Sequence, residues 1–262
     1  MMLLIMLHFK LLINTNFPVK MTMFAWTTAL LLVSTLALTE STDPRDSYTF
    51  FELVRQWSPN MCYQASHACK HLPPTIDTWT IHGLWPTLNS TSYPSNCAGD
   101  QCHFDSNNIA DLADELHVKW PSDYKGQDTK FWTHEFCKHG TCATDVLCTQ
   151  HAYFAKALTL HNELDVEAAL GAVGIIPDWN QTYSMNRLED AIRKWFGVDE
   201  ATYWCRFVRD NGETKQLLYQ VSLCLDKKFR VRNCPVMPRH SCDEEKEFYL
   251  LPFDVFNTFG RS

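Results

Sequence analysis

The stretch QLLYQVSLCLDKKFRVRNC, from Gln216 to Cys234, decides the fold class. Its first half carries apolar side chains at every second position, namely Leu217, Tyr219, Val221, Leu223 and Leu225. A period of two is typical of a β-strand with one buried face. A polar turn is predicted next, at Asp226, Lys227 and Lys228. The chain then returns as an antiparallel partner, so the sequence predicts a hairpin near its C-terminal end.

Strands are also predicted near the start of the domain, and helices lie between the two sets. YTFFELVRQW, residues 48–57, is apolar on both faces, as a central strand is, and DTWTIHGLW, residues 77–85, predicts a second strand. Four helices are predicted within residues 107–120, 131–142, 151–164 and 184–197. This order predicts an α+β fold, with a central antiparallel sheet and several packed helices in a single disulfide-stabilised domain.

The N-terminal region has the form of a secretory signal peptide. Residues 21–42, MTMFAWTTALLLVSTLALTEST, contain an apolar run from Ala29 to Leu38, and Lys20 precedes them. The run is shorter than the ~20 apolar residues of a membrane-spanning helix, so cleavage is favoured over a retained anchor. We therefore assign residues 1–42 to the signal region, with Met21 or Met23 as alternative starts. Residues 43–262 form the domain, for which no membrane association is expected.

Cysteines and sequons agree with a secreted chain. Eleven cysteines favour disulfides over cytosolic thiols, and their odd number leaves at least one without an intramolecular partner. Asn89 and Asn180 each begin a glycosylation sequon.

The charge of the chain limits how it could hold nucleic acid. The formal net charge is −7, whereas proteins that bind nucleic acid by their overall field are normally basic. An RNA substrate would therefore have to be held by a local pocket.

FWTHEFCKHGTC, residues 131–142, approaches the H-E-x-x-H pattern of zinc proteases. Its histidines, His134 and His139, are five positions apart rather than four, and at 100° per residue they point ~140° apart on a helix. That angle is unsuitable for a shared metal, so no metal is predicted. A spacing of four instead pairs His134 with Lys138, and Glu135 with His139. The result is a cationic cradle suited to a phosphate, with a solvated helix face bearing ordinary ion pairs as the alternative.

A second segment, TWTIHGLWPT at residues 78–87, adds a histidine from a separate element. His82 is predicted at a strand end, close to Trp85. Cleavage of a ribose phosphodiester without metal needs a base for the 2′-hydroxyl proton and an acid for the leaving 5′-oxygen. Histidine suits both roles because its pKa lies near the working pH. A purely structural histidine is the alternative.

The segments WTIHGLWP and FWTHEFCKHGTC together resemble the two active-site segments of the ribonuclease T2 family, the acid endoribonucleases. The resemblance extends from about Phe50 to about Phe253 and includes YPSNC at residues 93–97. It implies cleavage of single-stranded RNA by metal-independent transesterification to a 2′,3′-cyclic phosphate, followed by 3′-phosphate ends. It further implies an acidic pH optimum, low base specificity and no cofactor. DNA lacks the 2′-hydroxyl and is not expected to be cut.

The resemblance also implies roles for individual residues. His139 is the expected base and His82 the expected acid, His134 contacts the phosphate, and Glu135 and Lys138 stabilise the pentacoordinate state. The expected base-binding residues are Trp85, Tyr93, Phe131 and Gln56. Core packing is the alternative for the aromatic ones. Many relatives carry Asp directly after the Trp-Pro pair, where this chain has Thr87, so the base preference is open.

The family pattern implies four disulfides: Cys62–Cys69, Cys97–Cys142, Cys205–Cys242 and Cys224–Cys234. Cys102 and Cys148 follow Cys97 and Cys142 at similar distances, so an additional bridge between them is expected. Cys137 would then remain as a small buried apolar side chain.

The resemblance implies a secreted or endolysosomal monomer. One alternative is a relative whose main role is binding or signalling. Another is an inactive storage or defence protein, which the three retained histidines disfavour.

Overall fold

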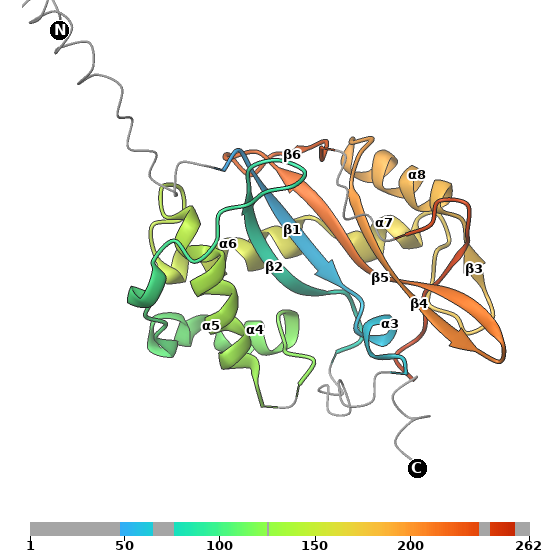
Figure 1. Cartoon of the computed structure of the whole chain (residues 1–262), viewed down its shortest axis with the longest axis horizontal. Coiled ribbons are helices and arrows are strands. Elements are labelled where there is room, and N and C mark those ends of the chain that lie inside the picture. The colour runs from blue at the N-terminus through green and yellow to red at the C-terminus, as the bar shows by residue number, and fades with distance from the viewer. Residues whose placement is uncertain (1–47, 65–75, 125, 236–241, 255–262) are drawn as a thin grey trace, which may run out of the picture. The chain divides into compact units, whose positions relative to one another are not determined.

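The sheet of this computed structural model is built around β5, and the structure describes residues 48–64, 76–124, 126–235 and 242–254. The strand order is β2-β1-β5-β7-β3, and β4 and β6 also pair with β5 (Figure 1). The seven strands are β1 (Phe50–Gln56), β2 (Thr80–Thr87), β3 (Thr182–Tyr183), β4 (Thr202–Asp210), β5 (Glu213–Leu225), β6 (Val231–Arg232) and β7 (Phe248–Tyr249). The predicted hairpin is confirmed as β5–β6. The β5–β7 pair is parallel, so the sheet is mixed rather than wholly antiparallel.

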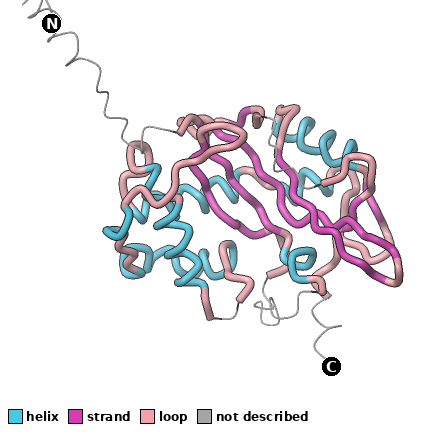
Figure 2. Tube along the Cα trace, in the orientation of Figure 1, coloured by secondary structure: helices cyan, strands magenta, loops and turns pink. Residues whose placement is uncertain are grey.

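Helical segments flank the central run of strands (Figure 2). In the described part of the chain, the α-helices are α3 (Ser58–Cys62), α4 (Ala113–Lys119), α5 (Asp128–Lys138), α6 (Gln150–Glu163), α7 (Val166–Gly171) and α8 (Met185–Phe196), and the 3-10 helices are η3 (Gly99–Gln101), η4 (Ser106–Leu112) and η5 (Gly140–Ala143). Hydroxyl side chains cap the N-termini of two of these α-helices. Thr149 accepts a hydrogen bond from the N–H of Ala152 at the start of α6, and Ser184 accepts one from the N–H of Arg187 at the start of α8. Gly197, at φ 73°, ends α8 as predicted. The α+β class is confirmed.

The two faces of the sheet differ in chemistry. Alternate residues of β1 and β5, such as Phe51, Leu53 and Leu225, pack against apolar side chains of α6. Several of the intervening residues, such as Glu52 and Ser222, are buried although they are polar, and they lie beside apolar Phe50 and Val54. One face of the sheet therefore carries a hydrophobic core, and the other carries a buried polar layer.

The alternation predicted for β5 fails at one point. In the pairing with β4, Trp204 lies opposite Gln220 and Cys205 lies opposite Leu218, so Tyr219 has no opposite residue. Such a bulge shifts the side-chain alternation by one position. Leu218 consequently joins Val221 in one core cluster, and Leu217 packs in another.

Three of the predicted disulfides are confirmed: Cys97–Cys142, Cys205–Cys242 and Cys224–Cys234. Cys62 is also disulfide-bonded, and its expected partner Cys69 lies outside the described residues.

The prediction for the three other cysteines was wrong. Cys102 bonds to Cys137, with 5.6 Å between their Cα atoms, and Cys148 is exposed and free. Cys137 does lie on α5 between predicted site residues. However, Cys137 does not fill an apolar site, because its sulfur is bonded to Cys102, which directly follows η3. Spacing along the chain suggested Cys148 as the partner, but spacing does not record which segment packs against α5.

Candidate active site

A pocket of about 210 Å³ opens between β2, α5 and the polar face of the sheet. All five predicted catalytic and phosphate-binding residues line it, together with two of the predicted base-binding residues and three others. The lining residues are Glu52, His82, Trp85, Thr87, Tyr93, His134, Glu135, Lys138, His139 and Trp204.

His82 lies within β2, where it is half-buried. Its backbone carbonyl accepts a hydrogen bond of 2.9 Å from the Trp120 indole. Its ring makes an edge contact with Trp85, with centroids 5.1 Å apart, and lies 5.8 Å from the Phe131 ring. Burial, and then the neighbouring cations of His134 and Lys138, lower the pKa of His82 to about 4.

A chain of side-chain amides fixes the ring of His82 from behind. The Gln220 amide nitrogen donates to His82 Nδ1 and, at 3.1 Å, to Gln56 Oε1. Gln56 Nε2 in turn donates to Asp123 at 2.6 Å, and Ser58 donates to the same carboxylate at 3.1 Å. When the ring is neutral, Nδ1 accepts from this amide and the ring proton resides on Nε2; in the imidazolium, Nδ1 is a donor and this hydrogen bond is lost.

Glu135 and Trp85 form the central contact between α5 and β2. The Trp85 indole donates to Glu135 Oε2 at 2.8 Å, and Glu135 is only 1% exposed. Burial raises the pKa of Glu135 to about 8. A Cβ atom at Gly83 would collide with both partners, so glycine is required there.

His139 lies just beyond the last residue of α5. The predicted helix continued through it, but α5 ends at Lys138, and the His139 N–H donates to the Glu135 carbonyl at 3.0 Å. The imidazole stacks on Trp85, with centroids 5.1 Å apart and planes at 23°. Burial, followed by Lys138 and two histidines, lowers the pKa of His139 to about 2. Glu135 therefore does not pair with His139 as predicted, since its carboxyl accepts a hydrogen bond from the Trp85 indole, which itself stacks on His139.

Lys138 and His134 provide the positive charge of the pocket. His134 is largely exposed, and its partial burial, followed by the Lys138 ammonium, lowers the pKa of its imidazole. The Lys138 ammonium lies 6.0 Å from the centre of the Tyr93 ring. A phosphate entering the pocket would therefore meet a cation at its rim.

Of the four predicted base-binding residues, the structure places two in the pocket lining and two outside it. Trp85 and Tyr93 line the pocket. Phe131 contacts the His82 ring instead, and the amide of Gln56 is engaged by Asp123 and Gln220. Gln56 therefore lies in the chain of hydrogen bonds behind His82.

Four residues of the site were not predicted from the sequence: Glu52, Asp123, Trp204 and Gln220. The signal for Glu52 was present, because a carboxylate inside a strand that is apolar on both faces requires an explanation. Asp123 and Gln220 carry no local signal, since their roles arise from contacts between segments far apart in the sequence.

Within the described residues, no three His, Cys, Asp or Glu side chains are arranged to hold a metal ion. The same part of the chain contains no helix with the length and apolar character to cross a membrane. The sequon residues Asn89 and Asn180 are both exposed.

The sequence profile of the Ribonuclease T2 family matches residues 48–234. This chain belongs to the ribonuclease T2 family. Ribonuclease Oy of Magallana gigas is 36% identical over 213 residues, which cover 78% of this chain and 97% of that protein. Extracellular ribonuclease LE of Solanum lycopersicum is 36% identical over 224 residues, covering 84% of this chain and 94% of that protein.

A solved relative shows the same fold with a nucleotide bound. The crystal structure of RNase NT in complex with 5′-AMP superposes with a TM-score of 0.68 at 29% identity, covering 79% of this chain and 99% of that one. Together these relatives establish that the chain is an RNA endonuclease.

Proposed function

We propose that this ribonuclease cleaves single-stranded RNA by metal-independent transesterification, with His139 as general base and His82 as general acid. The observation that carries the proposal is that both imidazoles lie 5.1 Å from the Trp85 ring, in one pocket with Lys138. A phosphodiester held there would meet both proton-transfer groups that the reaction requires.

The proposed reaction has two steps. The ribose 2′-oxygen attacks phosphorus while its proton passes to the His139 imidazole. The bond from phosphorus to the 5′-oxygen breaks, and that oxygen takes a proton from the His82 imidazolium. The products are a 2′,3′-cyclic phosphate and a 5′-hydroxyl. Water then opens the cyclic phosphate with the two histidine roles reversed, leaving a 3′-phosphate.

Three side chains would stabilise the pentacoordinate state. Lys138 and His134 would place positive charge on the phosphoryl oxygens. Because the pKa of Glu135 is raised to about 8, its carboxyl is neutral in acid and can donate a hydrogen bond to the same oxygens. It therefore adds no negative charge beside the phosphate.

An acidic optimum follows from the two histidine pKa values. The pKa of His82 is about 4, so its imidazolium fraction in the free enzyme grows as the pH falls from 7. The pKa of His139 is about 2, so it stays a neutral base over the same range. We therefore expect kcat/KM to rise between pH 7 and pH 5, because this quantity reports the ionisation of the free enzyme.

The decisive experiment incubates the purified mature protein with RNA at pH 5 in EDTA and analyses the ends produced. Cyclic-phosphate ends are expected, and His82→Ala and His139→Ala should each lower cleavage by roughly 100-fold or more. His151→Ala, at an exposed histidine paired with Asp111, is the matched control. Unchanged cleavage in the two site variants, or cleavage only after zinc is added, would exclude this mechanism. DNA should remain intact.

We also propose that the protein is a secreted or endolysosomal monomer whose signal region comprises residues 1–42. Four fully described disulfides support an oxidising compartment. N-terminal sequencing of protein secreted from cells that express the full chain should begin near residue 43, and gel filtration should give a monomer.

A further inference from the structure

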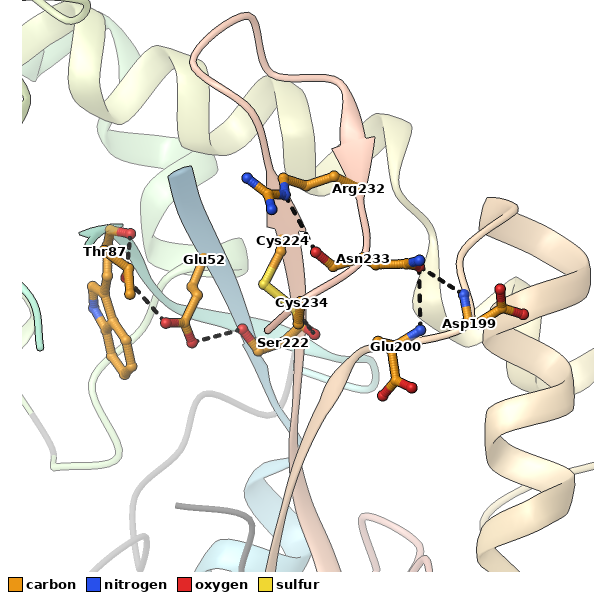
Figure 3. Close-up of a disulfide and its surroundings, with 10 residues drawn as sticks. Glu52, Thr87, Asp199, Glu200, Ser222, Cys224, Arg232, Asn233 and Cys234 are labelled. Atoms are coloured by element: carbon orange, nitrogen blue, oxygen red, sulfur yellow. Dashed lines mark hydrogen bonds between the residues drawn. A yellow bond between two sulfur atoms is a disulfide. The ribbon is translucent and has the colours of Figure 1, made fainter. Parts of the chain in front are cut away.

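Glu52 is a buried carboxylate in the pocket that the proposed mechanism does not use. It lies in β1 opposite Trp85 of β2 and Cys224 of β5, and it is 3% exposed. Thr87 donates to its Oε1 at 3.0 Å and Ser222 donates to its Oε2 at 3.3 Å. Figure 3 shows the carboxylate held between these two hydroxyls.

Hydrogen bonds fix the orientation of the Glu52 carboxylate. A buried carboxylate is costly unless hydrogen bonds satisfy it, and here the two strands beside β1 each supply a hydroxyl donor. The oriented carboxylate also lines the pocket. Glu52 therefore presents a fixed acceptor to the pocket.

Its neighbours in the pocket are suited to a nucleobase. Trp85 and Trp204 line the same space, and indole faces stack on any base. His139, which would take the proton of the attacking 2′-oxygen, stacks directly on Trp85, and Trp85 lies opposite Glu52. His82 also contacts Trp85, but His139 in addition contacts Tyr93, a second aromatic residue of the pocket lining, with ring centroids 5.8 Å apart. We therefore assign the base nearest to Glu52 to the nucleotide whose 2′-oxygen attacks.

The four RNA bases differ in what they offer to a fixed carboxylate. Guanine presents two adjacent donors, N1–H and the exocyclic N2 amino group, which can bind both oxygens or bridge one. Adenine and cytosine each place a ring acceptor beside their amino group. Uracil places its single N–H between two carbonyl oxygens, which a carboxylate repels. Only guanine therefore matches a carboxylate with two parallel donors.

We propose that Glu52, oriented by Thr87 and Ser222, selects guanine at the nucleotide on the 5′ side of the scissile bond. The proposal rests on the cleavage mechanism proposed above. Stacking still admits every base, and the carboxylate adds a preference among them. Thr87, which stands where many relatives carry Asp, then contributes by orienting the Glu52 carboxylate rather than by supplying a carboxylate itself.

The test compares kcat/KM for the dinucleoside phosphates GpU, ApU, CpU and UpU at pH 5. GpU should be preferred by roughly 10- to 100-fold, the range of a good bidentate base contact. Inosine retains N1–H but lacks the N2 amino group, so IpU should lose a large part of that preference. Glu52→Gln should bring the GpU to UpU ratio close to one.

Glu213→Gln, at an exposed glutamate near the start of β5, is the matched control and should keep the wild-type ratio. If Glu52→Gln does not fold, the comparison of GpU with IpU on the wild-type enzyme still decides. A preference for ApU, equal rates for GpU and IpU, or an unchanged ratio in a folded Glu52→Gln variant would overturn the guanine assignment. Failure to cleave any of the dinucleotides would instead count against the proposed mechanism.

Discussion

At the scale of single residues, the Glu135 carboxyl couples the site to stability. Its pKa rises from 4.5 to about 8 on folding, so the folded state holds a proton that the unfolded state releases above pH 4.5. Stability therefore falls as the pH rises from about 4.5 to about 8. Glu135→Gln removes this loss and keeps an acceptor for the Trp85 indole. We expect the variant to gain stability relative to wild type at pH 7.5, by roughly 3 °C or more in Tm.

Thermal unfolding at pH 5 and pH 7.5 checks this expectation, and the quantity compared is the difference in Tm between variant and wild type. Groups common to both proteins cancel in that difference. Glu213→Gln, at an exposed site, should show no such change with pH. A Glu135→Gln difference that is equal at the two pH values would mean that the folded carboxyl is ionised.

At the scale of elements, β5 reaches the catalytic centre through the amide chain behind His82. Gln220→Leu removes the donor to His82 Nδ1, and the ring is then free to change its tautomer and its orientation. Asp123→Asn weakens the far end of the same chain. We expect each variant to lower kcat by roughly tenfold, a fraction of the 10²- to 10⁴-fold that proton transfer by a positioned group supplies, with little change in KM.

A double-mutant cycle distinguishes positioning from general damage. If Asp123 acts on His82 through Gln56 and Gln220, the Asp123→Asn/Gln220→Leu double variant should lose little more than Gln220→Leu alone. The pH dependence of kcat should also shift in Gln220→Leu, because His82 has lost a fixed partner. Additive losses of kcat with an unchanged pH profile would show that Asp123 and Gln220 do not act on His82 through one chain of hydrogen bonds.

The elements that sequence reasoning predicted well are those with long periodic patterns. β1, β2 and β5 and the helices α6 and α8 were found because burial on one or both faces repeats over several residues. β3 and β7, with two residues each, exist only through their pairing, and no local pattern marks them. The chemistry of α5 was predicted from spacing, yet its end at Lys138 changed the partner of Glu135. The motifs identified the site, whereas its supporting contacts depended on tertiary packing.

At the scale of the whole molecule, net charge and substrate charge have the same sign. The chain carries −7, and Lys138 and His134 are the residues of the pocket lining that can place positive charge on a phosphate. We therefore expect RNA to be held by a local contact in the pocket rather than by an extended basic surface. Since each neutralised phosphate of a single strand contributes about 0.7 to the salt slope, log Kd should rise with log[salt] with a slope below about 1.5.

The measurement uses an RNA oligonucleotide that is 2′-O-methylated at every residue, which leaves no 2′-hydroxyl to attack, and follows Kd between 50 and 300 mM salt by fluorescence anisotropy. Lys138→Ala should reduce the slope by about 0.7, the contribution of one phosphate. Lys130→Ala is the matched control, because this lysine is exposed on the same helix and does not line the pocket. A wild-type slope of about 3 or more would require four or more phosphate contacts. Such a slope would show that basic groups beyond the pocket bind the RNA strand.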